Sequence, residues 1–112
     1  MIRFLSNTLV MPKTSKIRQS ARLKECQVRI PGICSFDDTE TILAHKNGAG
    51  MAMKSNDSHG AYCCHNCHAE IDSIYGNRKS EFSDDEILIM FYEGIFRTQL
   101  ILIEENLIIV KS

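Results

Sequence analysis

Two widely separated pairs of cysteines constrain what this chain of 112 residues can fold into. Cys26 and Cys34 form the first pair, and Cys64 and Cys67 form the second. Two thiolates separated by two residues at the start of a helix can bind one tetrahedral zinc ion from the same side, and a distant second pair completes the ligand set. The cysteines therefore predict a small domain built around a structural zinc ion.

The adjacent residues Cys63 and Cys64 leave the choice of one ligand open. Cys64 keeps the gap of two residues to Cys67, so we favour Cys64 and expect Cys63 to be a strand thiol packed inside. Buried free thiols or an adventitious disulfide are the alternatives to a zinc site. A further alternative is that His68, directly after Cys67, replaces one cysteine as a zinc ligand.

The number of cysteines and the character of the N-terminus favour metal binding over disulfide bonds. Five cysteines fit four ligands and one free thiol better than two bridges. Residues 1–10 are mildly apolar but lack the cationic start, long apolar region and cleavage site of a secretory signal. No stretch approaches the roughly 18 apolar residues that span a bilayer. We therefore expect a cytoplasmic protein with no membrane partner, in a compartment where thiols stay reduced.

The length of the chain indicates a single domain. Its charged residues are distributed unevenly. Residues 1–30 carry seven basic residues against one acidic residue, a net charge of +6, so the overall charge of −1 leaves −7 for the remainder. We interpret residues 1–19 as a basic, partly disordered arm, with Met11 as an alternative natural start. Residues 20–112 form the domain, divided into a core (residues 20–76) and a C-terminal helical extension (residues 77–112).

A basic arm of this kind can contact phosphates and orient a nucleic acid without reading its sequence. The alternative is a solvated, flexible tail. The candidate nucleic-acid contacts are the basic residues near the start of the core, namely Lys16, Arg18, Arg22, Lys24 and Arg29.

The core is predicted to contain a short strand, a hairpin and a helix. Residues 26–30 alternate as a strand, followed by a turn at Pro31-Gly32. Residues 41–45 and 60–63 are expected to pair as a hairpin across an open loop. A helix over residues 66–75 follows, with Gly76 as its C-terminal cap. This order, with a cysteine pair at each end, describes an α+β treble-clef arrangement.

Two histidines and a carboxylate are predicted to meet between the hairpin and the helix. His45 ends the first strand, His68 lies in the first helical turn, and Asp72 follows His68 by one turn on the same face. His68 and Asp72 can hold a divalent ion while His45 acts as the base for a water molecule, which predicts phosphodiester hydrolysis. The alternatives are a structural, hydrogen-bonded His45 and an Asp72 that pairs with Arg78 or Lys79.

A second helix is predicted from the capping box Ser83-Asp84-Asp85-Glu86. Gly94 within it permits a close approach to the core. Residues 100–103 either continue this helix or form a hairpin with residues 107–110, and an exposed part of the segment could serve self-association. The apolar stripe at helical spacing is expected to pack on the core, and it comprises Ile87, Met90, Phe91, Gly94, Thr98 and Ile101.

Four segments resemble the YbcO-type family of phage and prophage proteins. They are residues 21–34, residues 43–45 ending on His45, residues 64–68, and residues 71–72. That family is regarded as a set of nucleases with an HNH-like ββα-metal core. The resemblance implies a zinc treble clef with an added C-terminal helix, a divalent-metal active site and a nucleic-acid substrate, DNA above all, inside a bacterial host cell.

The resemblance also implies roles for individual residues. The four cysteines bind structural zinc, His45 is the general base and His68 takes the final HNH position beside a catalytic Mg²⁺, Mn²⁺, Ni²⁺ or Zn²⁺. Many HNH enzymes place a metal ligand directly before the base, whereas this chain has Ala44. Asp72 is the first choice for the missing ligand, while Asp57 and His59 compete for the role of the central Asn.

Two further functional hypotheses stand beside a metal-dependent endonuclease. Ala44 and the lack of a clear central Asn motivate a zinc-stabilised nucleic-acid-binding module without catalysis. The acidic C-terminal part motivates a protein-interaction module.

Overall fold

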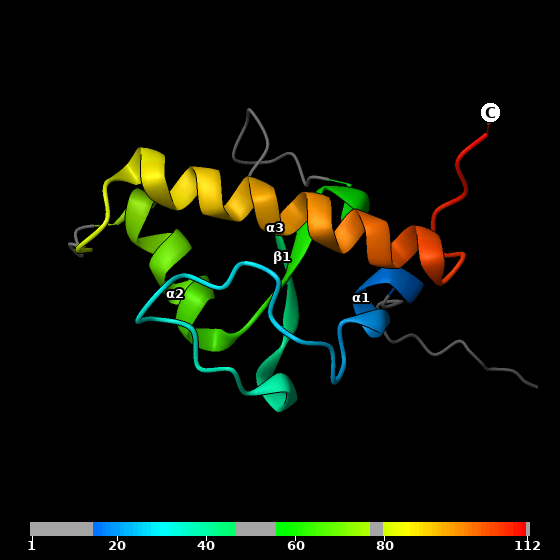
Figure 1. The fold of residues 1–112 in the computed structure, drawn as a ribbon, viewed down its shortest axis with the longest axis horizontal. Coiled ribbons are helices and arrows are strands. Elements are labelled where there is room, and N and C mark those ends of the chain that lie inside the picture. Colours follow the sequence, from blue (N-terminus) through cyan, green and yellow to red (C-terminus); the bar gives the residue numbers. More distant parts are fainter. Residues whose placement is uncertain (1–14, 47–55, 77–79, 112) are drawn as a thin grey trace, which may run out of the picture.

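A two-stranded antiparallel hairpin lies at the centre of the molecule, with one long helix along one side of it (Figure 1). The computed structural model describes residues 15–46, 56–76 and 80–111. The elements are α1 (Lys16–Ser20), β1 (Ile42–His45), β2 (Gly60–Cys63), α2 (His65–Asp72) and α3 (Asp84–Glu104), with short 3₁₀ turns η1 (Asp38–Glu40), η2 (Asp57–His59) and η3 (Ser73–Tyr75). The predicted α+β class is confirmed.

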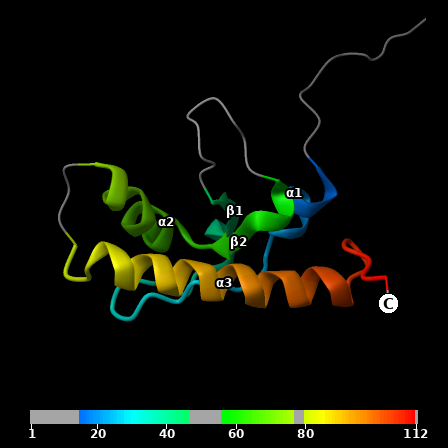
Figure 2. The ribbon, with the colours of Figure 1, turned by 90° about the horizontal axis from the view of Figure 1, so that it is seen from above.

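The predicted hairpin is confirmed as well. Its register pairs Leu43 with Tyr62 and His45 with Gly60. A side chain at Gly60 would bring its Cβ to 2.8 Å from Leu43 Cγ, so the close approach of the strands requires glycine here. The 90° view of Figure 2 shows α3 along one side of the hairpin and α1 and α2 at its two ends.

The strand predicted over residues 26–30 is wrong. Arg29 has a φ of 56°, in the left-handed region, which no continuous strand accommodates. Its guanidinium donates to the carbonyl of Cys26 and to Gln27 Oε1, both at 3.2 Å, and holds the turn. The apolar residues of the alternation, Cys26, Val28 and Ile30, are still buried in the core, but Gln27 between them is buried as well.

Helix α2 begins on a cysteine and ends earlier than expected. Cys64 is the N-cap, and its Sγ accepts from the backbone amide of Cys67 at 3.4 Å. The α-helix ends at Asp72 and η3 continues it to Tyr75, so the predicted segment is helical but changes pitch. Gly76 follows in an extended conformation rather than a left-handed one.

Helix α3 confirms the predicted capping box and settles how residues 100–103 fold. Ser83 Oγ accepts from the Glu86 amide at 3.1 Å, and Glu86 Oε1 accepts from the Ser83 amide at 2.9 Å. At the other end, Asn106 has a φ of 61°, and the amide of Leu107 donates to Leu102 O at 2.8 Å. This is a Schellman cap, which asparagine tolerates, so the helical alternative holds and the hairpin alternative is wrong.

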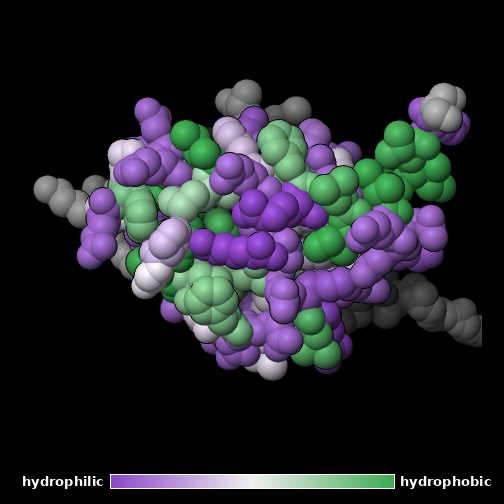
Figure 3. Space-filling view, viewed as in Figure 1, coloured by the Kyte–Doolittle hydropathy of each residue, from purple (hydrophilic) through white to green (hydrophobic). Residues whose placement is uncertain are grey.

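Two faces of α3 carry apolar side chains. The inner face is buried, and it comprises Ile87, Phe91, Gly94, Ile95, Thr98 and Leu102. Met90 and Ile101, which the sequence placed in this stripe, are half-buried. The outer face also carries exposed apolar residues, and Figure 3 shows hydrophobic side chains along α3 with hydrophilic ones between and below them.

Helix α1 lies at the boundary of the predicted N-terminal arm, of which residues 1–14 fall outside the described residues. Ser15 caps α1 by accepting from the Arg18 amide at 3.1 Å, so residues 16–19 of that arm are helical. Ser20 Oγ lies 2.7 Å from the hydroxyl of Tyr62, whose ring is fully buried. This contact fixes α1 against β2. Among the helices of the described residues, not one has the length and apolar character that crossing a bilayer requires.

Candidate functional site

Four cysteine sulfur atoms converge where the turn after Cys26 meets the start of α2. The Sγ atoms of Cys26, Cys34, Cys64 and Cys67 all lie within 4.8 Å of one another, and the Cys34 and Cys64 sulfurs are 3.9 Å apart. A tetrahedral zinc ion with Zn–S bonds of about 2.3 Å requires sulfur atoms about 3.8 Å apart. The four cysteines can therefore hold a metal ion such as zinc. Within the described residues, neither Cys63 nor His68 belongs to this group.

Backbone amides prepare one of these thiols for metal binding. Burial by itself would raise the pKa of Cys64. The amides of Ser35 and Cys67 donate to its Sγ at 3.5 and 3.4 Å, and their effect outweighs burial, so the net pKa is lowered. A thiolate stabilised by N–H donors is the form that binds a metal.

Cys34 and Cys63 differ from Cys64 in the direction of the pKa shift. Burial raises the pKa of Cys34 to about 11, so metal binding at this residue has to displace a proton. Hydrogen bonding to Cys26, together with burial, raises the pKa of Cys63 far above its usual value. Cys63 is fully buried in β2, where a neutral thiol behaves as a small apolar side chain.

His45, at the end of β1, is paired with a carboxylate. Its Nε2 lies 2.5 Å from Asp57 Oδ1 in η2. Asp57 also accepts a hydrogen bond from Ser15 Oγ and lies 3.4 Å from Arg18 Nε. The hydrogen bond from Ser15, more than any other contact, lowers the pKa of Asp57. The carboxylate is therefore ionised at neutral pH. It links the imidazole of His45 to Ser15 and Arg18 at the start of α1.

His68 and Asp72 lie across a small cavity from this pair. The cavity has a volume of about 200 Å³, and His45, His68 and Asp72 all line it, together with Phe91 from α3. His68 Nδ1 lies 3.8 Å from Asp72 Oδ2, close enough for one cation to bridge the two side chains. Both are partly open to solvent. The structure thus brings three of the predicted site residues together.

Asp57 and His59, the two candidates for the role of the central Asn, differ in their surroundings. Asp57 is committed to His45 and Ser15. His59 is exposed, and it is not among the described residues that line the cavity. The alternative partners of Asp72, Arg78 and Lys79, lie outside the described residues.

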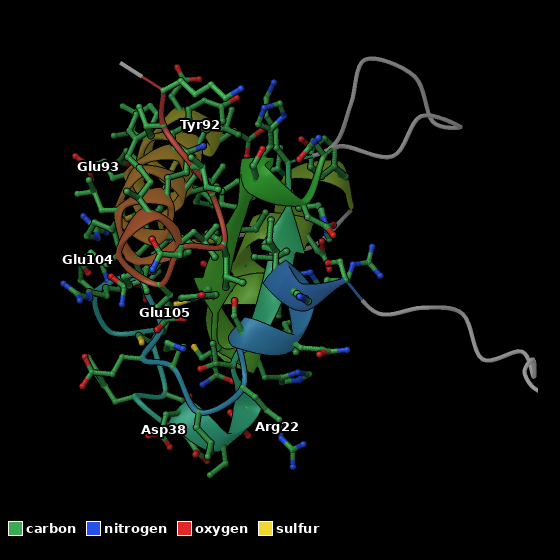
Figure 4. The ribbon with its side chains drawn as sticks, turned by 90° about the vertical axis from the view of Figure 1, so that its right-hand side faces the viewer. Arg22, Asp38, Tyr92, Glu93, Glu104 and Glu105 are labelled. Carbon is green, nitrogen blue, oxygen red and sulfur yellow. The ribbon has the colours of Figure 1, made fainter. Side chains whose placement is uncertain are left out.

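The five basic residues predicted to contact nucleic acid lie in different surroundings. Arg18 and Arg22 line an open groove of about 760 Å³ that runs between α1 and β1 to His45. Figure 4 shows Arg22 at the end of the molecule away from Tyr92. Lys24 instead lies 3.0 Å from Glu105 Oε2, and Arg29 is used in the turn after Cys26. Lys16 is exposed on α1.

Ser15 belongs to this site although its sequence position did not predict it. Its hydroxyl caps α1 and contacts Asp57, which lies 42 positions further along the chain. A serine directly before a short helical segment is a recognisable N-cap, and that signal would have identified the start of α1. Nothing local in the sequence indicates the contact with Asp57.

Comparisons with known proteins identify relatives over most of the chain. A family described as "Putative nuclease YbcO" matches residues 15–107. Proteins of that name from Escherichia coli K12 and from Enterobacteria phage 82 are each 36% identical over 99 residues, covering 82% of this chain and 95% of the relative. A solved structure of a bacteriophage protein from E. coli K-12 superposes with a TM-score of 0.66 at 35% identity, covering 81% of this chain and all of that one.

Proposed function

The chain belongs to the YbcO family, and on that basis we propose that it is a metal-dependent endonuclease that hydrolyses the phosphodiester bonds of nucleic acid, DNA in the first instance. The observation that carries the proposal is the shared cavity of His45, His68 and Asp72. The cysteine cluster, hairpin and α2 correspond to the zinc treble clef and HNH-like ββα-metal core that we assign to the fold.

The metal sites have different purposes in this proposal. Zinc bound by the four cysteines is structural, because its four protein ligands leave no open position for a substrate. A second divalent ion, Mg²⁺, Mn²⁺, Ni²⁺ or Zn²⁺, fits the imidazole and carboxylate of His68 and Asp72. When bound, such an ion supplies charge stabilisation to the scissile phosphate and the leaving oxygen.

His45 is the general base. In this proposal Nε2–H of His45 donates a hydrogen bond to Asp57 Oδ1, which leaves Nδ1 as the basic nitrogen that takes a proton from the attacking water. We assign Asp57 as a positioning residue, since its carboxylate fixes the orientation and tautomer of the ring. Ser15 and Arg18 in turn hold that carboxylate, which couples α1 to the base.

The substrate backbone follows the groove between α1 and β1. Arg18 and Arg22 line this groove and offer positive charge to phosphates, while the groove leads directly to His45. Contacts of this kind set the register of a nucleic acid without selecting its sequence. Lys24 and Arg29, engaged elsewhere, are not part of this path.

The test is cleavage of supercoiled plasmid by the purified, zinc-loaded protein with magnesium, manganese or nickel. Nicked or linear product should form, and His45→Ala should reduce the rate by about 10²- to 10⁴-fold, the usual contribution of a general base. His65→Ala is the matched control, because His65 is exposed on α2 and is not among the described residues that line the cavity. Equal activity of His45→Ala and the parent would refute the assigned base.

One observation favours a second candidate, a zinc-stabilised nucleic-acid-binding module without catalysis. The position before His45 is Ala44, which is buried and has no ligand atom. This hypothesis expects salt-sensitive binding to DNA or RNA, and no cleavage with any of the metals tested.

A further inference from the structure

Helix α3 presents a second apolar stripe on the side opposite its buried face. A surface helix normally has one apolar face, so a second one indicates a partner. At 100° per residue the members of this outer stripe fall within an arc of about 80°. They are Ile89, Tyr92, Phe96, Leu100 and Ile103, with exposed fractions of 58%, 36%, 64%, 64% and 37%.

The spacing of the outer stripe is symmetric about Phe96. Successive members are three, four, four and three residues apart, so the order of intervals is the same from either end. If a second α3 lies antiparallel with Phe96 on the two-fold axis, Ile89 faces Ile103 and Tyr92 faces Leu100. A two-fold interface requires such self-complementarity, because each residue pair occurs twice.

We propose that two copies of this chain associate through the outer stripes of α3 as an antiparallel, two-fold symmetric pair. The five side chains of both copies bury on the order of 1,000 Å² together, which meets the lower limit for a specific interface. The pair is independent of the nuclease assignment, since its evidence lies on the opposite side of α3 from the cavity that Phe91 lines.

Charges beside the stripe suit the same register. Glu93 and Arg97 flank one edge of it, and Figure 4 shows Glu93 projecting from α3 away from the hairpin. In the antiparallel pair, Glu93 of one copy lies about 3 Å along the helix axis from Arg97 of the other. The carbonyl of Gln27 accepts from Arg97 Nε at 3.0 Å, which fixes the guanidinium between this edge of α3 and the turn after Cys26. The arrangement therefore places opposite charges together twice.

Sedimentation velocity over a wide concentration range tests the association. The parent should sediment with twice the chain mass of 12.7 kDa, and Phe96→Glu should sediment as one chain because two carboxylates would meet at the axis. Phe36→Glu is the matched control, since Phe36 is 82% exposed outside the stripe. A parent that stays at the mass of one chain overturns the proposal, even if the stripe is covered by another part of the chain or by another protein.

Cysteine cross-linking tests the register and does not depend on the folding of Phe96→Glu. A mixture of Ile89→Cys and Ile103→Cys should form a disulfide-linked pair far faster than either variant alone, with the parent as the blank for the native cysteines. Self-cross-linking of Ile89→Cys in preference to the mixture indicates parallel helices and overturns the antiparallel pair. No cross-link in any combination overturns it as well.

Discussion

The hydroxyl of Thr98 forms a hydrogen bond between the long helix α3 and the hairpin. Thr98 Oγ1 accepts from the Tyr62 amide at 3.0 Å and donates to Gly94 O at 2.8 Å, and it is fully buried. Strand β2 has one strand partner in the described structure, so this side chain satisfies an amide on its other edge. A different case is Thr41, whose buried Oγ1 has no hydrogen-bond partner among the described residues.

We predict opposite responses to the same substitution at these two sites. Thr98→Val should destabilise the protein by about 1–3 kcal/mol, because it leaves the Tyr62 amide buried and unpaired. Thr41→Val should be neutral or slightly stabilising, since it removes an unpaired polar atom. Denaturant unfolding of the zinc-loaded variants measures both. A loss of stability at Thr41 as large as that at Thr98 would contradict the argument.

Asp57 offers a prediction about catalysis rather than stability. Asp57→Asn should lower kcat by about 10- to 100-fold, as removal of an orienting partner typically does, while KM for DNA changes little. Ser15→Ala, which removes one contact to Asp57 but keeps the carboxylate, should have a smaller effect in the same direction. Steady-state kinetics on a fluorescent duplex decides the matter, and a change confined to KM would show that Asp57 serves binding instead.

Some side-chain contacts of the candidate site could be predicted from the sequence, and others could not. The spacing of His68 and Asp72 on one helical turn places them together whatever the rest of the chain does. The pairing of His45 with Asp57 is different, because it depends on how the chain returns to β2 after residues 47–55, which lie outside the described residues. No local pattern in the sequence encodes that return.

At the scale of elements, α3 and the turn after Cys26 approach one another more closely than side chains normally allow. A Cβ on Gly94 would lie 2.9 Å from Val28 Cγ2 and 3.1 Å from the carbonyl oxygen of Gln27. The carbonyl of Gln27 in this turn also accepts a hydrogen bond from Arg97 Nε. Glycine at position 94 therefore lets α3 pack on the segment that carries the first cysteine pair.

Gly94→Ala should destabilise the protein, although helix propensity alone predicts that it stabilises it. Alanine favours a helix interior over glycine by about 1 kcal/mol, yet the clash with Val28 should give a net loss of about 1–3 kcal/mol. Gly76→Ala is the matched control, because among the described residues its Cβ would meet only Asp72 O, at 3.8 Å, and φ is negative. Thermal unfolding compares the two, and a stabilised Gly94→Ala would mean that the two segments can separate without cost.

Element boundaries were predictable where side chains cap the backbone and less so elsewhere. Ser83 and Glu86 mark the start of α3 through their own hydrogen bonds, so the sequence was sufficient. The apolar alternation of residues 26–30 identifies Cys26, Val28 and Ile30 as core residues but misses the burial of Gln27. It also misses the conformation, because Arg29 adopts a left-handed backbone that alternation does not reveal. Asn106 is a turn signal in either alternative, and only packing of Leu107 beside Leu102 decides for the helix cap.

At the scale of the whole molecule, the cysteine cluster joins distant parts of a small chain. We predict that each chain binds one zinc ion and that Cys34→Ser loses both the metal and cooperative unfolding, because structural zinc contributes directly to folding. Cys63→Ala should retain the zinc, since Cys63 is not part of the cluster. Elemental analysis measures the zinc content, and calorimetry measures the cooperativity of unfolding. Zinc lost equally from both variants would contradict the assigned ligand set.

Helix α3 lies in the segment proposed as an extension (residues 77–112) of the core (residues 20–76), and it contributes to the packing around the cysteines. Its inner face supplies Ile87, Phe91 and Ile95 to the same hydrophobic cluster that surrounds the cysteines. Gln99 also donates to the carbonyl of Ser58, next to Asp57. The sequence predicted the helix and its buried stripe, but it gave no indication that the helix also supports the segment holding His45.

The contact between Thr98 and the Tyr62 amide has a consequence for biosynthesis. A ribosome makes the hairpin and all four thiols of the cysteine cluster before it makes α3. We therefore expect that the nascent chain can bind its metal ion while one side of β2 is still exposed. Completion of the fold has to wait until the last third of the polypeptide has emerged. A translation pause between the hairpin and α3 should therefore give an intermediate that already contains metal but is still sensitive to proteases and recognised by chaperones.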